Sequence, residues 1–174
     1  MKQEELSEIL KKHKLWLDKE EGGVRANLTD ADLRDADLSG ANLRGVNLTD
    51  ADLRWADLSF ADLRFAVLRD TDLRGVNLTD AVLRDTDLRG VNLTDADLRD
   101  ADLSEADLYQ ANLEGADLRE ADLNGADLRQ ADLSQADLTG AYLSEADLSG
   151  ADLSFADLCN ANLSNVKINK ETKF

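Results

Sequence analysis

Residues 26–45 read ANLTD-ADLRD-ADLSG-ANLRG, four consecutive copies of one five-residue unit. Each copy begins with a small residue, continues with Asp or Asn, and has Leu in third position. The leucine recurs at every fifth position from Leu28 to Leu163, twenty-eight times without a gap, and Ile168 extends the series. The chain is therefore a repeat protein, and its fold has to satisfy the same geometry at every unit.

The five-residue spacing fits neither regular secondary structure. On an α-helix five residues advance about 500°, so successive leucines would scatter around the axis. On a continuous strand an odd spacing sends alternate leucines to opposite faces. Within one unit, however, the small residue and the leucine are two apart and share a face, and the polar positions accept turn geometry. We therefore predict an extended step and a corner in each unit, with core leucines that begin at Leu28, Leu33, Leu38 and Leu43.

These units, of which Ala31-Asp32-Leu33-Arg34-Asp35 is one, resemble those of the pentapeptide-repeat family, and the resemblance covers residues 26–168. The resemblance implies an all-β solenoid in the form of a right-handed quadrilateral β-helix with four pentads per coil. At four units per coil, the twenty-eight units would make about seven coils.

Three segments are predicted: an N-terminal capping helix and connector at 1–25, the β-helix at 26–168, and a C-terminal tail at 169–174. Apolar residues at spacings of three and four predict a helix over residues 4–21, ended by Gly22 and Gly23. An uncovered first coil would expose its core and unpaired strand edges. We expect the helix to close that end; the alternative is a helix that binds a partner. The predicted capping residues are Leu6, Ile9, Leu10, Trp16 and Leu17.

The last residues, Asn165 to Phe174, are too few for a second helix of this kind. Either Val166, Ile168 and Phe174 cover the last coil, or two copies of the chain meet there. Proteins that the repeat resembles often dimerise through their C-terminal coils, which favours a homodimer.

The formal net charge of -17 argues against direct binding to nucleic acid or to an anionic membrane surface, because like charges repel over roughly 10 Å. A single cysteine, Cys159, excludes an intramolecular disulfide and any multi-cysteine metal site. No apolar run approaches the roughly 18 residues that span a bilayer, and no signal peptide is recognisable. The expectation is a cytoplasmic protein without cofactor or metal.

Arginines twenty residues apart are expected to stack on the outside. One stack holds Arg34, Arg54 and Arg74, and the opposite face holds Arg44, Arg64 and Arg84. We expect these guanidinium groups to neutralise neighbouring aspartate ladders; an anion-binding groove is the alternative.

Trp55, Phe60 and Phe65 occupy the fifth position of three consecutive units, an outward corner in the fold that the resemblance implies. Large apolar groups on three corners of one coil form a candidate interaction patch. The alternative is an apolar surface without a function.

No catalytic residue is predicted: His13 is the only histidine and lies on the apolar face of the predicted helix, and no insertion between units could build a pocket. The sequence thus favours a non-catalytic structural or protein-interaction rod of unknown partner. The alternative is a DNA mimic, because an acidic rod of duplex width imitates DNA, and some pentapeptide-repeat proteins bind DNA gyrase, inhibiting it or protecting it from quinolones. The same lack of insertions weakens this alternative, since the quinolone-protection members often carry and use such loops.

Overall fold

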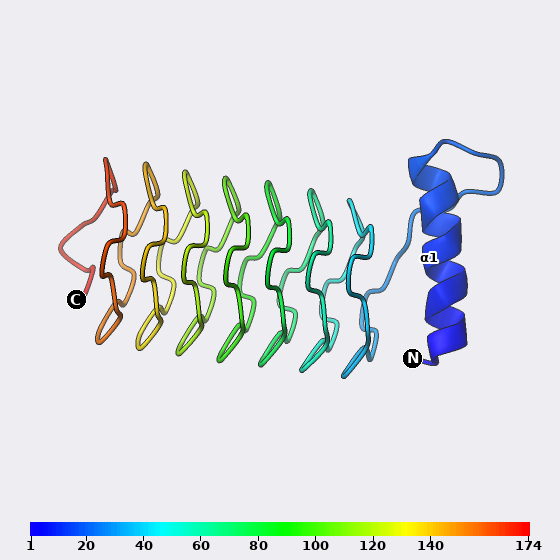
Figure 1. Ribbon diagram of the computed structural model, residues 1–174, viewed down its shortest axis with the longest axis horizontal. Coiled ribbons are helices and arrows are strands. Elements are labelled where there is room, and N and C mark those ends of the chain that lie inside the picture. Colours follow the sequence, from blue (N-terminus) through cyan, green and yellow to red (C-terminus); the bar gives the residue numbers. More distant parts are fainter.

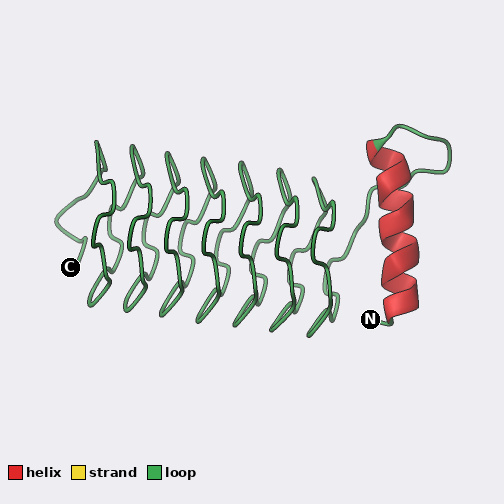
Figure 2. Ribbon diagram, in the orientation of Figure 1, coloured by secondary structure: helices red, strands yellow, loops and turns green.

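The computed structural model describes residues 1–174 and contains one helix, α1 (Gln3–Leu17), followed by a stack of coils. Figure 1 shows α1 lying across one end of the stack, with the C-terminus at the far end. The coils contain only single-residue bridges and turns, so Figure 2 draws everything beyond α1 as loop. No helix has the length and hydropathy needed to cross a membrane.

The coils are held in a twenty-residue register. Parallel bridges such as Asp32↔Asp52 and Asp52↔Asp72 join residues twenty apart, and four such ladders run along the stack. At the bridge between Asp32 and Asp52 the backbone donates in both directions: Leu33 N–H to the Asp52 carbonyl at 2.8 Å, and Asp52 N–H to the Ala31 carbonyl at 2.9 Å. One turn of the solenoid therefore contains four pentads, and the corner after each bridge prevents a longer strand.

The core consists of the third-position leucines and the small residues two positions before them. Leu28, Leu33, Leu38 and Leu43 are all buried, and they belong to one cluster of 49 buried residues. Thr71 replaces the small apolar residue in one unit and is also buried, but its hydroxyl donates to the Leu48 carbonyl at 2.9 Å. The core thus accepts a polar group where the backbone offers a partner.

Two local features shape each corner: a side-chain hydrogen bond and a left-handed backbone conformation. The second-position carboxylate or amide accepts the backbone N–H two residues later, as Asp37 Oδ1 does from Ser39 at 3.1 Å. The fifth residue has a left-handed backbone, with φ of 56° at Asp35 and 63° at Gly40. Asp and Asn are favoured at both positions because their short side chains bond to nearby backbone and tolerate positive φ.

Helix α1 ends at Leu17, so the prediction of a helix to residue 21 is wrong at that end. After Asp18 the chain turns through Lys19, at φ 57°, and Gly22, at φ 80°, and then passes back against the helix. A side chain at Gly23 would collide with the backbone of Trp16. The two glycines therefore serve the reversal of the chain beyond the helix rather than the end of the helix itself.

The apolar side chains of α1 are buried against the first coil to different extents. Leu6 is buried in the common core, and Ile9 and Leu10 pack against it. Leu17 is half-buried, whereas Trp16 is exposed at the edge of the contact.

Candidate interaction surfaces

Three aromatic side chains project from consecutive corners of one coil. Trp55, Phe60 and Phe65 are 62%, 65% and 53% exposed, respectively. Their φ angles are 58°, 60° and 59°, a left-handed conformation that costs an ordinary residue roughly 1–2 kcal/mol. Bulky apolar residues therefore occupy positions where burial gives them little and the backbone disfavours them. We call these three side chains the aromatic corners.

The aromatic corners do not form one flat patch. Each follows a different ladder: Trp55 comes after the bridge Asp52↔Asp72, Phe60 after Asp57↔Asn77, and Phe65 after Asp62↔Val82. The three side chains consequently leave the solenoid on three different edges. A partner that contacts all of them has to wrap around the coil.

Trp55 and Phe65 each have a distinct neighbour. The guanidinium of Arg54 lies 5.7 Å from the centre of the Trp55 ring, a cation–π distance. Phe65 borders a hollow that it shares with Trp16 of α1.

Phe155 is a fourth exposed aromatic residue in the same fifth position, and the sequence reasoning above did not single it out. It is 92% exposed and also has a positive φ, at 64°. An aromatic residue at the fifth position of a unit is the sequence feature that identifies Phe155. Phe155 lies five coil registers beyond Trp55 along the same corner, since the two are separated by a multiple of twenty residues.

The stack of Arg34, Arg54 and Arg74 is paired with an aspartate ladder. Arg34 donates from Nε and Nη2 to both oxygens of Asp32, at 2.8 and 2.7 Å, and its Nε lies 3.6 Å from Asp52 of the next coil. Arg54 repeats this arrangement with Asp52 and Asp72. Hydrogen bonds from Arg34 hold the pKa of Asp32 far below its usual value. These guanidinium groups are thus engaged by carboxylates, as the neutralising role requires.

The C-terminal half carries carboxylates without such partners. Residues 101–165 contain fourteen acidic residues and two arginines, Arg119 and Arg129. Both arginines pair within their own units, with Asp117 and Asp127. The glutamates at corners of this half, including Glu105 and Glu145, form no ion pair. This half is a strongly negative surface.

The last coil is incompletely covered. Lys173 bridges to Asp152 and donates to its carboxylate, which lowers the pKa of Asp152 to about 2. That bridge spans twenty-one residues instead of twenty, so the tail follows the ladder with one extra residue. Ile168 and Phe174 nevertheless remain exposed, and Val166 is only half-buried. An apolar surface is left at this end.

His13 and Cys159 have contrasting surroundings. His13 is completely buried, and its Nδ1 accepts the Ala26 backbone N–H at 3.2 Å while its ring stacks on Trp16 at 5.4 Å. Burial lowers the pKa of His13, so the ring is neutral and joins α1 to the start of the first coil. Cys159 is an exposed free thiol.

Comparisons with known proteins agree with this architecture. The sequence model described as pentapeptide repeats matches in eight copies, over residues 26–64, 56–95, 96–135 and 126–165. Among solved structures, QnrB1, a plasmid-mediated fluoroquinolone resistance protein, is 19% identical at a TM-score of 0.59, with 83% of each chain covered.

Two cyanobacterial structures also match. HetL from Nostoc, a pentapeptide-repeat protein involved in the regulation of heterocyst differentiation, is 30% identical, with 88% of this chain and 92% of HetL covered at a TM-score of 0.25. Rfr23 from Cyanothece is 24% identical, with 93% and 95% covered at a TM-score of 0.30. No curated protein sequence matches the chain.

Proposed function

The chain belongs to the pentapeptide-repeat family, and from that premise we propose that it is a non-catalytic rod that binds another protein through Trp55, Phe60 and Phe65. Its proposed parts are the capping segment 1–25, the right-handed β-helix of about seven coils at 26–168, and the tail 169–174. The cytoplasm is the proposed location, since its reducing conditions keep an exposed thiol such as Cys159 free.

The observation that carries the proposal is the exposure of the aromatic corners in a left-handed conformation. Aspartate, asparagine or glycine would relieve the backbone at these positions, and the chain uses them at most of its other corners. Aromatic residues contribute strongly to protein interfaces when a partner covers them. Retaining three of them on one coil is therefore best explained by a bound partner.

The test compares two baits in a cross-linking pull-down. The first is the unchanged protein, and the second carries Trp55→Asn, Phe60→Asn and Phe65→Asn together, since asparagine accepts the corner geometry. The proposal expects that the unchanged bait and a Phe155→Asn control both capture the same protein. The triple variant is expected not to capture it. Equal capture by the triple variant would overturn the proposed surface.

A homodimer through the C-terminal coils is proposed as the assembly of the rod. Exposed Ile168 and Phe174 with half-buried Val166 support it, because a second copy would cover this apolar end. Sedimentation of the unchanged protein and of an Ile168→Asp variant tests it. A dimer that dissociates in the variant is expected, and a monomer at all micromolar concentrations would contradict it.

The second candidate function is DNA mimicry toward DNA gyrase or a related topoisomerase. It is favoured by the acidic surface of residues 101–165, with fourteen acidic residues against two arginines. The unbroken five-residue period speaks against it, since it leaves no loop between coils. A gyrase supercoiling assay decides: inhibition, or protection from a quinolone, supports mimicry, and unchanged supercoiling at a large molar excess refutes it.

A further inference from the structure

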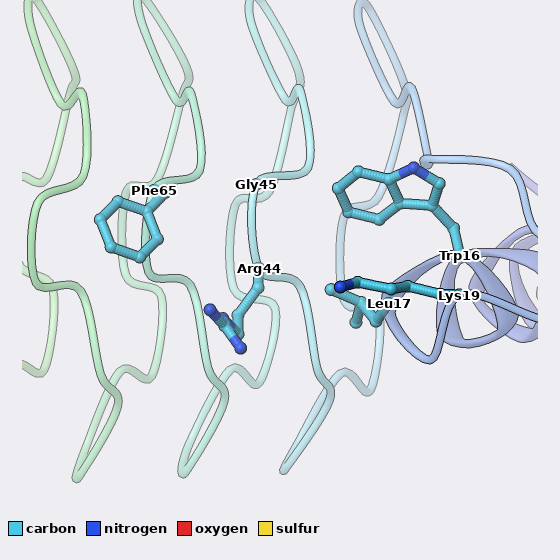
Figure 3. A pocket seen from close by; sticks show the side chains of 6 residues that line it. All are labelled: Trp16, Leu17, Lys19, Arg44, Gly45 and Phe65. Carbon is cyan, nitrogen blue, oxygen red and sulfur yellow. The ribbon is translucent and has the colours of Figure 1, made fainter.

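A hollow of about 490 Å³ lies at the seam between α1 and the solenoid. It is lined by Trp16, Leu17, Lys19, Arg44, Gly45 and Phe65. Figure 3 shows the Trp16 ring on the side of the helix and the Phe65 ring on the side of the coils, with Arg44 between them. The volume lies within the ~300–1,000 Å³ that small-molecule sites occupy.

Arg44 differs from every other arginine of the repeat. Residues 26–165 contain eleven arginines, and all but Arg44 form an ion pair with a carboxylate. The cause lies in its own unit, where Asn42 stands in place of aspartate. Asp62, the ladder residue of the next coil, pairs with Arg64 at 2.6 Å and forms no ion pair with Arg44. The Arg44 guanidinium is therefore available to an external anion.

The Nε of Arg44 carries a further indication. It is a buried donor without a hydrogen-bond partner. Because a buried donor left unpaired costs roughly 1–3 kcal/mol, the present position of the Arg44 side chain gains nothing at Nε, and the guanidinium can turn toward a bound anion without losing a hydrogen bond there.

Two more cations without a carboxylate lie beside Arg44. Lys19 forms no ion pair, and Figure 3 shows its side chain extending from the end of α1 toward the coils. Arg25 donates from Nε to the Gly45 carbonyl at 2.5 Å, and its guanidinium lies 6.0 Å from the centre of the Trp16 ring. Three positive groups thus gather at one place on a protein with a net charge of -17.

Flat apolar surfaces complete the hollow. The Trp16 and Phe65 rings are both substantially exposed, and Gly45 adds no side chain between them. Gly45 has φ 68°, and a carbon added there would approach only Arg25, at 3.8 Å. The space between the rings is open to a planar group.

We propose that this hollow binds a small planar aromatic anion, with its ring system against Trp16 and Phe65 and its anionic group on Arg44 and Lys19. An aromatic carboxylate, sulfonate or phosphate satisfies the same chemistry. The hollow shares Phe65 with the proposed partner-binding surface, but it requires no protein partner, so ligand binding is measured on the protein alone and tests this proposal separately.

The test uses the fluorescence of 1-anilinonaphthalene-8-sulfonate (ANS) and of N-phenyl-1-naphthylamine (NPN), which has the same rings without the sulfonate. The proposal expects saturable ANS binding at one site and NPN binding weaker by about tenfold or more, the factor for one lost charge-assisted hydrogen bond. Arg44→Gln is expected to weaken ANS by about tenfold and to leave NPN unchanged. Phe65→Ala is expected to weaken both ligands.

Arg74→Gln is the matched control, because Arg74 has the same position in its unit but is paired with Asp72. It should change the Kd of ANS by less than about twofold. Lys19→Gln, on an exposed turn outside the helix, tests the charge without touching the coils. The proposal is overturned if NPN binds as tightly as ANS, or if Arg44→Gln and Lys19→Gln both match Arg74→Gln. Circular dichroism of each variant verifies that it folds.

Discussion

The Trp55 indole lies over Gly75, the residue that occupies the same corner in the next coil. A carbon added at Gly75 would come within 2.7 Å of Cδ1 of the indole. The largest aromatic corner therefore rests on a site where the repeat has no side chain. The orientation of Trp55 depends on a residue twenty positions away, and this dependence can be tested.

Gly75→Ala is expected to move the indole and to destabilise the protein more than Gly40→Ala does. Both glycines have φ 63°, so both variants carry the same backbone cost of about 1 kcal/mol. Gly40 has nothing within 4 Å of an added carbon, so the difference between the variants isolates the contact with Trp55. Urea unfolding and tryptophan emission measure the two effects. Equal destabilisation with unchanged emission would show that Trp55 gains nothing from Gly75.

A leucine-to-alanine change should cost most in the middle of the stack. Leu88 is fully buried, and Leu88→Ala is expected to lower the free energy of unfolding by about 2–5 kcal/mol. Leu163 has the same position in its unit but is exposed, so Leu163→Ala should cost less than about 1 kcal/mol. Chemical denaturation provides both values. A similar loss at the two sites would mean that the last coil is covered in solution, as it would be in a dimer.

The attachment of α1 should weaken in mild acid. Burial lowers the pKa of His13, and the charge of Arg25 lowers it further, against the opposing effect of the Arg44 backbone. The folded pKa thus lies below the unfolded value of about 6.5. As the pH falls below about 6.5, the unfolded chain takes up a proton that the folded chain refuses, so stability falls until the folded pKa is passed.

Thermal unfolding at pH 7.5 and pH 5.5 measures this loss for the unchanged protein and for His13→Gln. The unchanged protein should lose more stability between the two pH values than His13→Gln, which has no titrating group at this position. Identical losses would assign the pH dependence to the carboxylates instead.

Asn124 is expected to contribute to the free energy of unfolding because the repeat is irregular at Tyr142. Tyr142 replaces the aspartate that would accept the Ser144 backbone N–H, and Asn124 of the preceding coil accepts it instead, at 2.8 Å. Asn124→Ala should therefore cost about 1 kcal/mol in the unchanged protein. In a Tyr142→Asp background the loss should be less than half of that, because the local acceptor is restored. A double-mutant cycle measures the difference, and additive effects would contradict it.

Much of the solenoid was decided by the sequence alone. A two-residue spacing inside a five-residue period places Leu33 and Ala31 on one face, and Asp32 between them on the other, whatever lies further along the chain. The twenty-residue register of the ladders was implied by the resemblance to the pentapeptide-repeat family, since a five-residue period does not by itself set the number of units per coil. The short arginine–aspartate pairs, such as Arg34 with Asp32, lie within one unit and follow from the sequence of that unit.

The tertiary structure decided what the repeat does not encode. Helix α1 ends at Leu17 and the chain then folds back so that Gly23 packs against the backbone of Trp16, and no periodic pattern in the sequence records that contact. Asn42 already leaves Arg44 without a carboxylate in its own unit, but only the tertiary structure places Arg44 in one hollow with Trp16 and Lys19. A repeat specifies the contacts between its own units, whereas the position of a non-repeating helix depends on the particular side chains that meet at the seam.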